Sequence, residues 1–205
     1  MNPSIQFSDS DLLLDIRYDR VFKAVFTQNN SSSNGALSDL ISSLIKRRFS
    51  VASIAENEPP INDIRDRNIR FDISCKTLDG ELVNIEMSLN PDSYEPVRLE
   101  YYCGKLFTRQ DIHGVQTDYS DLKEAYQIAF LAKGRFFDDE VLVHTFSYHD
   151  PEYDISLEGK SQIVTVELAK TDLVIEKPAV EMATQEAWAA FFQYLTDRSK
   201  RAKIK

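Results

Sequence analysis

Asp72 and Glu86 are the two residues whose types and spacing could do chemistry, because their segment reads as a β-hairpin. A three-residue turn ending at Gly80, in the left-handed conformation that glycine tolerates, pairs Thr77 with Glu81. Extending this register makes one face of the hairpin wholly apolar, formed by Phe71, Ile73 and Cys75 opposite Met87, Ile85 and Val83. The same register places Asp72 directly opposite Glu86.

Two facing carboxylates on adjacent strands have Cβ atoms about 5 Å apart and repel each other. The repulsion raises at least one pKa unless a cation lies between them. Mg²⁺ or Mn²⁺ is one such cation, and it could orient and ionise an attacking water while stabilising charge on a scissile phosphate. The alternative is a solvated outer face of the hairpin, where screening tolerates the pair.

The surrounding elements follow from the periodicity of apolar residues. Spacings of three and four predict helices at 18–26 and 37–45, with the polar stretch 29–35 as a loop between them. The further predictions are extended segments at 68–76 and 81–88, a helix at 94–112, strands at 126–131, 141–148 and 162–168, and a final helix with an apolar stripe of Trp188, Phe191, Phe192 and Leu195. This order predicts an α/β protein with a mixed central sheet flanked by helices.

Length and composition suit one domain spanning residues 1–205, since 205 residues with 42% hydrophobic content bury one substantial core. The net charge of −9 opposes nucleic-acid binding, which depends on neutralising phosphates. Basic runs at 46–48 and 198–205 could still hold a phosphate backbone locally. Alternatively, they are solvated helix ends, where the helix dipole favours cations.

No apolar run approaches the roughly 18 residues of a membrane span, and the N-terminus lacks a basic start and an apolar core. Cys75 and Cys103 follow no metal-ligand spacing and form a poor disulfide framework. These features favour a cytoplasmic protein without a membrane partner.

Several motifs, in the same order, resemble the Rpn-like transposase-associated nuclease family of the PD-(D/E)XK superfamily. The matching residues are Asp19, Phe22, Lys23 and Phe26 in D-x-x-F-K-x-x-F; Phe71-Asp72-Ile73, Asp79-Gly80 and Ile85-Glu86-Met87 in the hairpin; Arg98, Tyr101, Tyr102, Lys105 and Leu106; and Gly114, Tyr119 and Leu122. The resemblance covers about residues 15–132, and 133–205 stay unassigned.

The resemblance implies a restriction-endonuclease-like fold and metal-dependent hydrolysis of DNA phosphodiesters. Asp72 and Glu86 would bind Mg²⁺ or Mn²⁺, and Asp19 would add an acidic ligand or orient a water. For Asp19 the alternative is an exposed acid in a first helical turn, favoured by the dipole.

Ser88 departs from the family pattern, which usually has Lys, or Gln in this branch, two residues after the Glu. Serine can hold a water on the same face as Glu86, but it reaches less far than Gln and carries no charge. Arg98, Tyr102 and Lys105 lie on one polar stripe of the predicted helix and are candidates for nucleic-acid binding, the alternative being a solvated helix face.

The sequence therefore predicts a metal-dependent DNA endonuclease of a mobile-element or recombination-associated family, weakened by Ser88. The alternative is an inactive nuclease fold that binds nucleic acid or protein. Many nucleases cut both strands as dimers, so a homodimer stays open, although no exposed apolar stripe requires one. The three histidines, His113, His144 and His149, complete no zinc-like spacing and receive no role.

Overall fold

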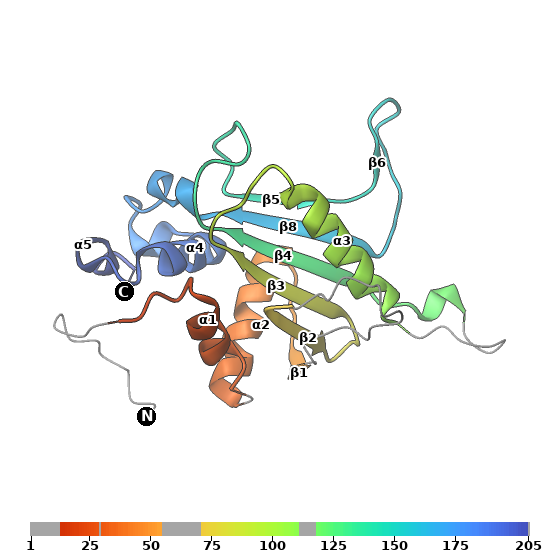
Figure 1. The fold of residues 1–205 in the computed structure, drawn as a ribbon, viewed down its shortest axis with the longest axis horizontal. Coiled ribbons are helices and arrows are strands. Elements are labelled where there is room, and N and C mark those ends of the chain that lie inside the picture. The colour runs from red at the N-terminus through yellow and green to blue at the C-terminus, as the bar shows by residue number, and fades with distance from the viewer. Residues whose placement is uncertain (1–12, 29, 55–70, 111–117, 205) are drawn as a thin grey trace.

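The computed structural model describes residues 13–28, 30–54, 71–110 and 118–204, and its centre is a six-stranded sheet (Figure 1). The strands of this sheet are β1 (Val51–Ile54), β2 (Ile73–Thr77), β3 (Leu82–Ser88), β4 (Ala125–Leu131), β5 (Val143–Phe146) and β8 (Ser161–Glu167). β6 (His149–Asp150) and β7 (Ile155–Ser156) form a separate small hairpin. The helices are α1 (Asp19–Phe26), α2 (Ser31–Ile45), α3 (Glu95–Thr108), α4 (Thr184–Tyr194) and α5 (Arg198–Arg201), with 3₁₀ turns η1 (Tyr119–Asp121), η2 (Leu168–Leu173) and η3 (Ala179–Glu181).

The sheet is mixed, with strand order β1-β2-β3-β4-β8-β5. β3, β4 and β8 are parallel to one another, while β1, β2 and β5 run antiparallel to their neighbours. The predicted α/β fold with a mixed central sheet and flanking helices is therefore confirmed, and it is consistent with a restriction-endonuclease-like fold. Two predicted boundaries were too wide, since α3 ends at Thr108 and β5 spans only Val143–Phe146. The start of the predicted extended segment, 68–70, lies outside the described residues.

Helices cover both faces of the sheet. α3 crosses one face over β3, β4 and β8, and α1, α2 and α4 pack on the other (Figure 1). Side chains alternate along each strand, so Val83, Ile85 and Met87 of β3 enter the core beneath α1, α2 and α4. The intervening residues of β3, among them Asn84 and Glu86, lie on the α3 side. With both faces covered, these polar residues are buried as well.

The predicted hairpin register is confirmed for the described strands. Ile73 pairs with Ile85 and Cys75 with Val83, and Gly80 has φ +89°, which a residue with a Cβ adopts only with strain. The prediction for Phe71 was wrong, because the chain bends at Asp72 before β2 begins. The bend sends Phe71 to the α3 side, where it packs with Leu106, Ala125 and Tyr102 instead of opposing Met87.

The predicted loop at 29–35 was also wrong, since α2 already begins at Ser31. The side chain of Asn30 accepts a hydrogen bond from the backbone N–H of Ser33 at 2.9 Å and so caps the helix. Ser33 is buried and donates from its hydroxyl to the carbonyl of Val25. Capping and tertiary burial thus outweigh the low helix propensity of the serine-rich stretch.

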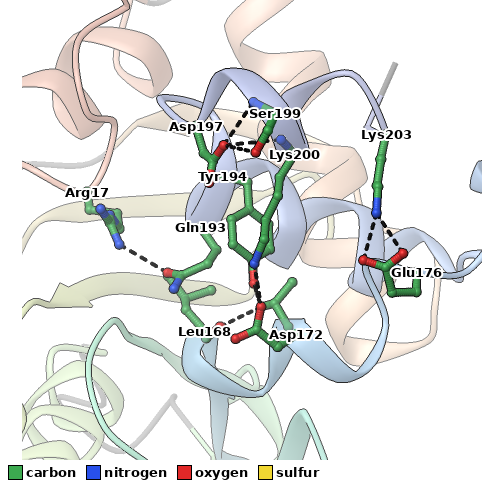
Figure 2. Close-up of polar contacts among 11 residues, drawn as sticks. Arg17, Leu168, Asp172, Glu176, Gln193, Tyr194, Asp197, Ser199, Lys200 and Lys203 are labelled. Carbon is green, nitrogen blue, oxygen red and sulfur yellow. Dashed lines mark hydrogen bonds and ion pairs between the residues drawn. The ribbon is translucent and has the colours of Figure 1, made fainter.

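The C-terminal third, unassigned from sequence, completes the sheet and holds α1 in place. β8 lies between β4 and β5, and Phe192 of α4 contacts the rings of Phe22, Phe26 and Phe130. Arg17, just before α1, donates to Gln193 at 3.0 Å (Figure 2). The C-terminal third therefore positions the helix that carries Asp19.

The cationic C-terminus is engaged by acids of the same chain. Lys200 pairs with Asp172 at 2.7 Å, where Tyr194 also donates its hydroxyl hydrogen, and Lys203 pairs with Glu176 at 2.6 Å (Figure 2). These contacts favour a structural role for the basic residues of 198–205 over phosphate binding. No helix in the described part of the chain is long and apolar enough to cross a membrane.

The position of Phe192 predicts that truncating it destabilises the whole fold. Phe192→Ala leaves a cavity among five aromatic rings and should lower the free energy of unfolding by about 3–5 kcal/mol in urea denaturation. Val180→Ala, at a residue 94% exposed, is the control and should change it by less than about 0.5 kcal/mol. Equal effects of the two variants would contradict the packing role of α4.

Candidate active site

Asp72 and Glu86 meet at the end of the β2–β3 hairpin. The backbone N–H of Asp72 donates to Oε1 of Glu86 at 3.1 Å, and the backbone N–H of Met87 donates to Oδ2 of Asp72 at 3.0 Å. Each carboxylate is thus fixed by the backbone of the other strand. The predicted juxtaposition of the two acids is present in the structure.

Two polar side chains, Asn84 of β3 and Gln127 of β4, form a hydrogen-bonded chain that ends at Glu86. Asn84 donates through Nδ2 to Oε1 of Glu86 at 3.0 Å and to Oε1 of Gln127 at 2.7 Å. Asn84, Glu86 and Gln127 are all buried. The Oδ1 atom of Asn84 is buried without a hydrogen-bond partner among the described residues, so an oxygen that could bind a metal ion lies beside the pair.

Burial makes this pair easy to protonate. The pKa of Glu86 is raised to about 7, first by burial and then by the charge of Asp72, while the Asn84 hydrogen bond and the charge of Arg98 oppose the rise. The pKa of Asp72 is also raised, chiefly by burial, against the opposing influence of the Met87 N–H and of Lys23. Both carboxylates therefore lie where added positive charge would stabilise their ionised forms.

Lys23 is a site residue that the sequence analysis quoted in a motif but gave no role. Its ammonium lies 3.3 Å from Oδ1 of Asp72 and 2.5 Å from Oδ1 of Asp19. Burial alone would lower the pKa of Lys23, but its contacts with Asp19 and Asp72 outweigh burial and raise it. The i, i+4 spacing of Asp19 and Lys23 was the sequence signal that could have indicated this ion pair.

Asp19 itself lies in the first turn of α1, with its side chain 59% exposed. Its ion pair with Lys23 links it to Asp72, and its charge raises the pKa of Asp72. The structure thus brings Asp19 to the edge of the carboxylate pair and leaves it more exposed than Asp72 or Glu86.

Ser88 lies two residues after Glu86 on the same strand face and opens into a cleft of about 690 Å³. Arg98 of α3 lines the same cleft, forms an ion pair with Glu95 at 2.6 Å and acts electrostatically on Glu86. The predicted polar stripe of α3 therefore faces the hairpin at this point. Arg98 is the residue of the stripe whose charge reaches the carboxylate pair.

The other members of the stripe are held against aromatic rings. Tyr102 packs edge-on against Phe71. The guanidinium of Arg98 lies 5.5 Å from the centre of the Tyr102 ring. The ammonium of Lys105 lies 5.8 Å from the ring centre of Tyr101. Tyr102 and Arg98 thus adjoin the site directly, and Lys105 lies one turn further along α3.

A second acidic group lies two strands away from β3, at the same end of the sheet, because Ser88 pairs with Leu131 and Leu131 with Glu167. Ligand atoms of Asp139, His144 and Glu167 come within 4.8 Å of one another, although the sequence gave His144 no role. The ammonium of Lys170, fully buried, lies 2.6 Å from both Asp139 and Glu167. Lys170 therefore compensates one of the two negative charges of this group, which the pairing of β5 with β8 helps to assemble.

The Asp72–Glu86 pair suits a hard divalent cation better than the second group does. It offers two carboxylates and the unused carbonyl oxygen of Asn84, and oxygen is the donor that Mg²⁺ and Mn²⁺ prefer. Its raised pKa values show that neighbouring groups compensate the acids only in part.

The raised pKa of Glu86 predicts a pH-dependent stability without divalent cations. Because the folded state binds this proton more tightly than the unfolded chain, the stabilisation is complete below about pH 4.5 and is lost as pH rises through about 7. The loss is on the order of 3 kcal/mol. Glu86→Gln should flatten this part of the profile in urea denaturation with EDTA, whereas Glu152→Gln, at an exposed position, should not. Parallel profiles for wild type and Glu86→Gln would contradict burial as the cause.

Comparison with protein-family models gives a match over residues 16–205 to the family described as PD-(D/E)XK nuclease family transposase. Neither the curated proteins nor the solved structures that were compared gave a match. The matched region includes the hairpin, α1 with Asp19 and Lys23, and the C-terminal strand and helices that sequence motifs left unassigned. With nearly its whole length matched and a mixed sheet that carries paired acids, the chain belongs to the PD-(D/E)XK nuclease family transposases.

Proposed function

We propose that this protein is a metal-dependent DNA endonuclease that hydrolyses phosphodiester bonds. The observation that carries the proposal is the pair of Asp72 and Glu86, which reciprocal backbone hydrogen bonds hold in place and whose pKa values burial raises. Membership of a nuclease family of mobile-element type supports it. The whole chain would act as one nuclease domain, because β8 and α4 complete the sheet and the packing of α1.

Asp72 and Glu86 would hold Mg²⁺ or Mn²⁺. Such an ion supplies Lewis-acid stabilisation of charge on the phosphate and lowers the pKa of a water. The protein's part is to fix both acids against the backbone and to keep Glu86 in place through Asn84. Arg98, which lines the adjacent cleft, would bind the phosphate, with Tyr102 and Lys105 extending the nucleic-acid contact along α3.

Lys23 would supply the positive charge that the family pattern usually places two residues after the Glu. Its ammonium already lies 3.3 Å from Asp72, whereas Ser88 at the family position is short and uncharged. Ser88 would hold a water on the Glu86 face, and Asp19 would position Lys23 through the i, i+4 ion pair. Because the ammonium of Lys23 reaches the site from α1, the positive charge does not have to come from residue 88 on β3.

Ser88 also favours a second candidate function, a nuclease fold that binds nucleic acid or protein without cleaving it. The overall charge of −9 points the same way, because Arg47 and Lys200 are already paired with acids of the chain. The two functions differ in one measurable property, which is hydrolysis.

The cytoplasm is the compartment that the cysteines favour. Cys75 and Cys103 are both free and buried, a state that a reducing compartment maintains without difficulty. DNA in the same compartment would be the partner. A homodimer would allow both strands to be cut, and sedimentation of the protein with DNA would determine the stoichiometry.

Cleavage of supercoiled plasmid with Mg²⁺ or Mn²⁺ tests the nuclease proposal. Wild type should nick the plasmid, and Glu86→Ala should reduce the rate by at least about a hundredfold, because it removes a preorganised charge from the site. Ser88→Gln should match or exceed wild type, since Gln reaches further towards the reacting water. Glu152→Ala, on the exposed β6–β7 hairpin, is the matched control.

No cleavage by wild type together with activity in Ser88→Gln would favour the second candidate, a scaffold whose centre is disabled. No cleavage by any of these variants would contradict the endonuclease proposal altogether.

Removing the charge of Lys23 should slow cleavage and also change its pH dependence. Lys23→Met should reduce the rate by about tenfold, or roughly 1.4 kcal/mol of barrier. It should also shift the acidic limb of the rate profile to higher pH, because Lys23 lowers the pKa of Asp72. Lys177→Met, which breaks an ion pair with Glu186, is the control. An unshifted acidic limb would show that Lys23 is only structural.

A further inference from the structure

The cleft beside the carboxylate pair is lined with tyrosines whose rings are open to solvent. Tyr94 is 75% exposed, Tyr101 is 43% exposed, and Tyr102 is partly buried beside them. The volume of about 690 Å³ lies within the range of about 300–1,000 Å³ typical of sites for small organic groups. Lys105 lies 5.8 Å from the ring centre of Tyr101, so the surface on which a flat ring can stack is formed by Tyr94 and by the exposed part of Tyr101.

This cleft adjoins the carboxylates directly. Ser88, one of its lining residues, is two positions from Glu86 on β3, which corresponds to about 7 Å along a strand. Arg98 lines the cleft and also acts on the charge of Glu86. A nucleotide that placed its base in the cleft would therefore hold its phosphate within reach of Arg98 and the carboxylate pair.

Among the residues that the structure describes, few cations lie at the rim of the cleft. Lys133 donates to Asn90, a lining residue, at 3.0 Å, and Lys105 lies over the ring of Tyr101. Asp92 and Glu95 line the same cleft, so its charge is balanced and not strongly positive. The described lining therefore offers few charges that could neutralise a row of duplex phosphates, whereas stacking of bases on aromatic rings needs little net charge.

Stacking also selects against a base-paired duplex. Each base of a duplex has both faces covered by its neighbours, so a tyrosine ring cannot reach them without unstacking the helix. In an unpaired strand the faces are available, and each stacked base contributes about 1–3 kcal/mol to binding.

We infer that the cleft of Tyr94, Tyr101, Ser88 and Arg98 binds the bases of unpaired DNA, so that the preferred substrate is single-stranded or locally melted. This inference rests on the proposed function for its biological meaning, but it concerns binding and is measurable without hydrolysis. Tyr94 and Tyr101 act as stacking platforms, and Arg98 takes the phosphate next to the stacked base. The balanced charge of the cleft is compatible with the acidic character of the whole chain.

Fluorescence anisotropy with labelled 12-mers, in EDTA so that no divalent ion is available, tests the inference. The full-length protein should bind the single strand at least about fivefold more tightly than the duplex of the same sequence. Tyr94→Ala and Tyr101→Ala should each weaken single-strand binding by about fivefold or more, and Tyr94→Phe and Tyr101→Phe, which keep the ring, should retain it. A strand with abasic sites should bind as weakly to wild type as the normal strand binds to the Ala variants.

Tyr119→Ala is the matched control, because Tyr119 is 78% exposed and lies beyond the opposite end of β4. It should leave binding unchanged. Equal or tighter binding of the duplex, or tyrosine-to-alanine variants that bind like wild type, would overturn the inference. If the binding inference fails but plasmid cleavage is observed, the proposed nuclease function stands. If the protein prefers the single strand but cleaves no DNA, the binding inference stands and the nuclease proposal fails.

Discussion

The site depends on the position of β3, which pairs antiparallel with β2 in the hairpin and parallel with β4 on its other side. Seven consecutive pairs join β3 to β4 and seven more join β4 to β8, and helices on both sides of the sheet bury both faces of these central strands. Polar residues on the α3 side must then satisfy one another, and Asn84 does so by bridging Gln127 and Glu86. This bridge is what allows a carboxylate to be held in a buried position.

The helices on the face opposite α3 supply a positive charge that the strands of the hairpin do not bring to the two acids. β2 and β3 bring the two acids together, but the cation that pairs with Asp72 in the described part of the chain is Lys23 of α1. α1 is fixed in turn by Phe192 of α4 and by the hydrogen bond from Arg17 to Gln193. The charge balance of the site thus depends on the C-terminal third, although none of its residues touches the acids in the described contacts.

Electrostatics explain how an acidic protein could act on DNA. Basic side chains in both cationic runs, Arg47 in one and Lys200 and Lys203 in the other, are paired with acids of the same chain. Long-range attraction of a duplex is correspondingly small. The contacts that the described lining of the cleft offers are short-range, with Arg98 beside the carboxylates and exposed tyrosines for stacking. Such contacts act only on DNA whose bases are accessible.

The sequence by itself determined the hairpin, its register and the opposition of Asp72 to Glu86, because alternation with a period of two allows one pairing once Gly80 sets the turn. It also indicated the fold class and most helices. Only the tertiary structure decided the bend that turns Phe71 to the α3 side, the helical start at Ser31, the approach of Lys23 to Asp72, and the assembly of the tyrosine cleft. Local patterns fix neighbours along a strand or helix, whereas these four features depend on packing between elements distant in sequence.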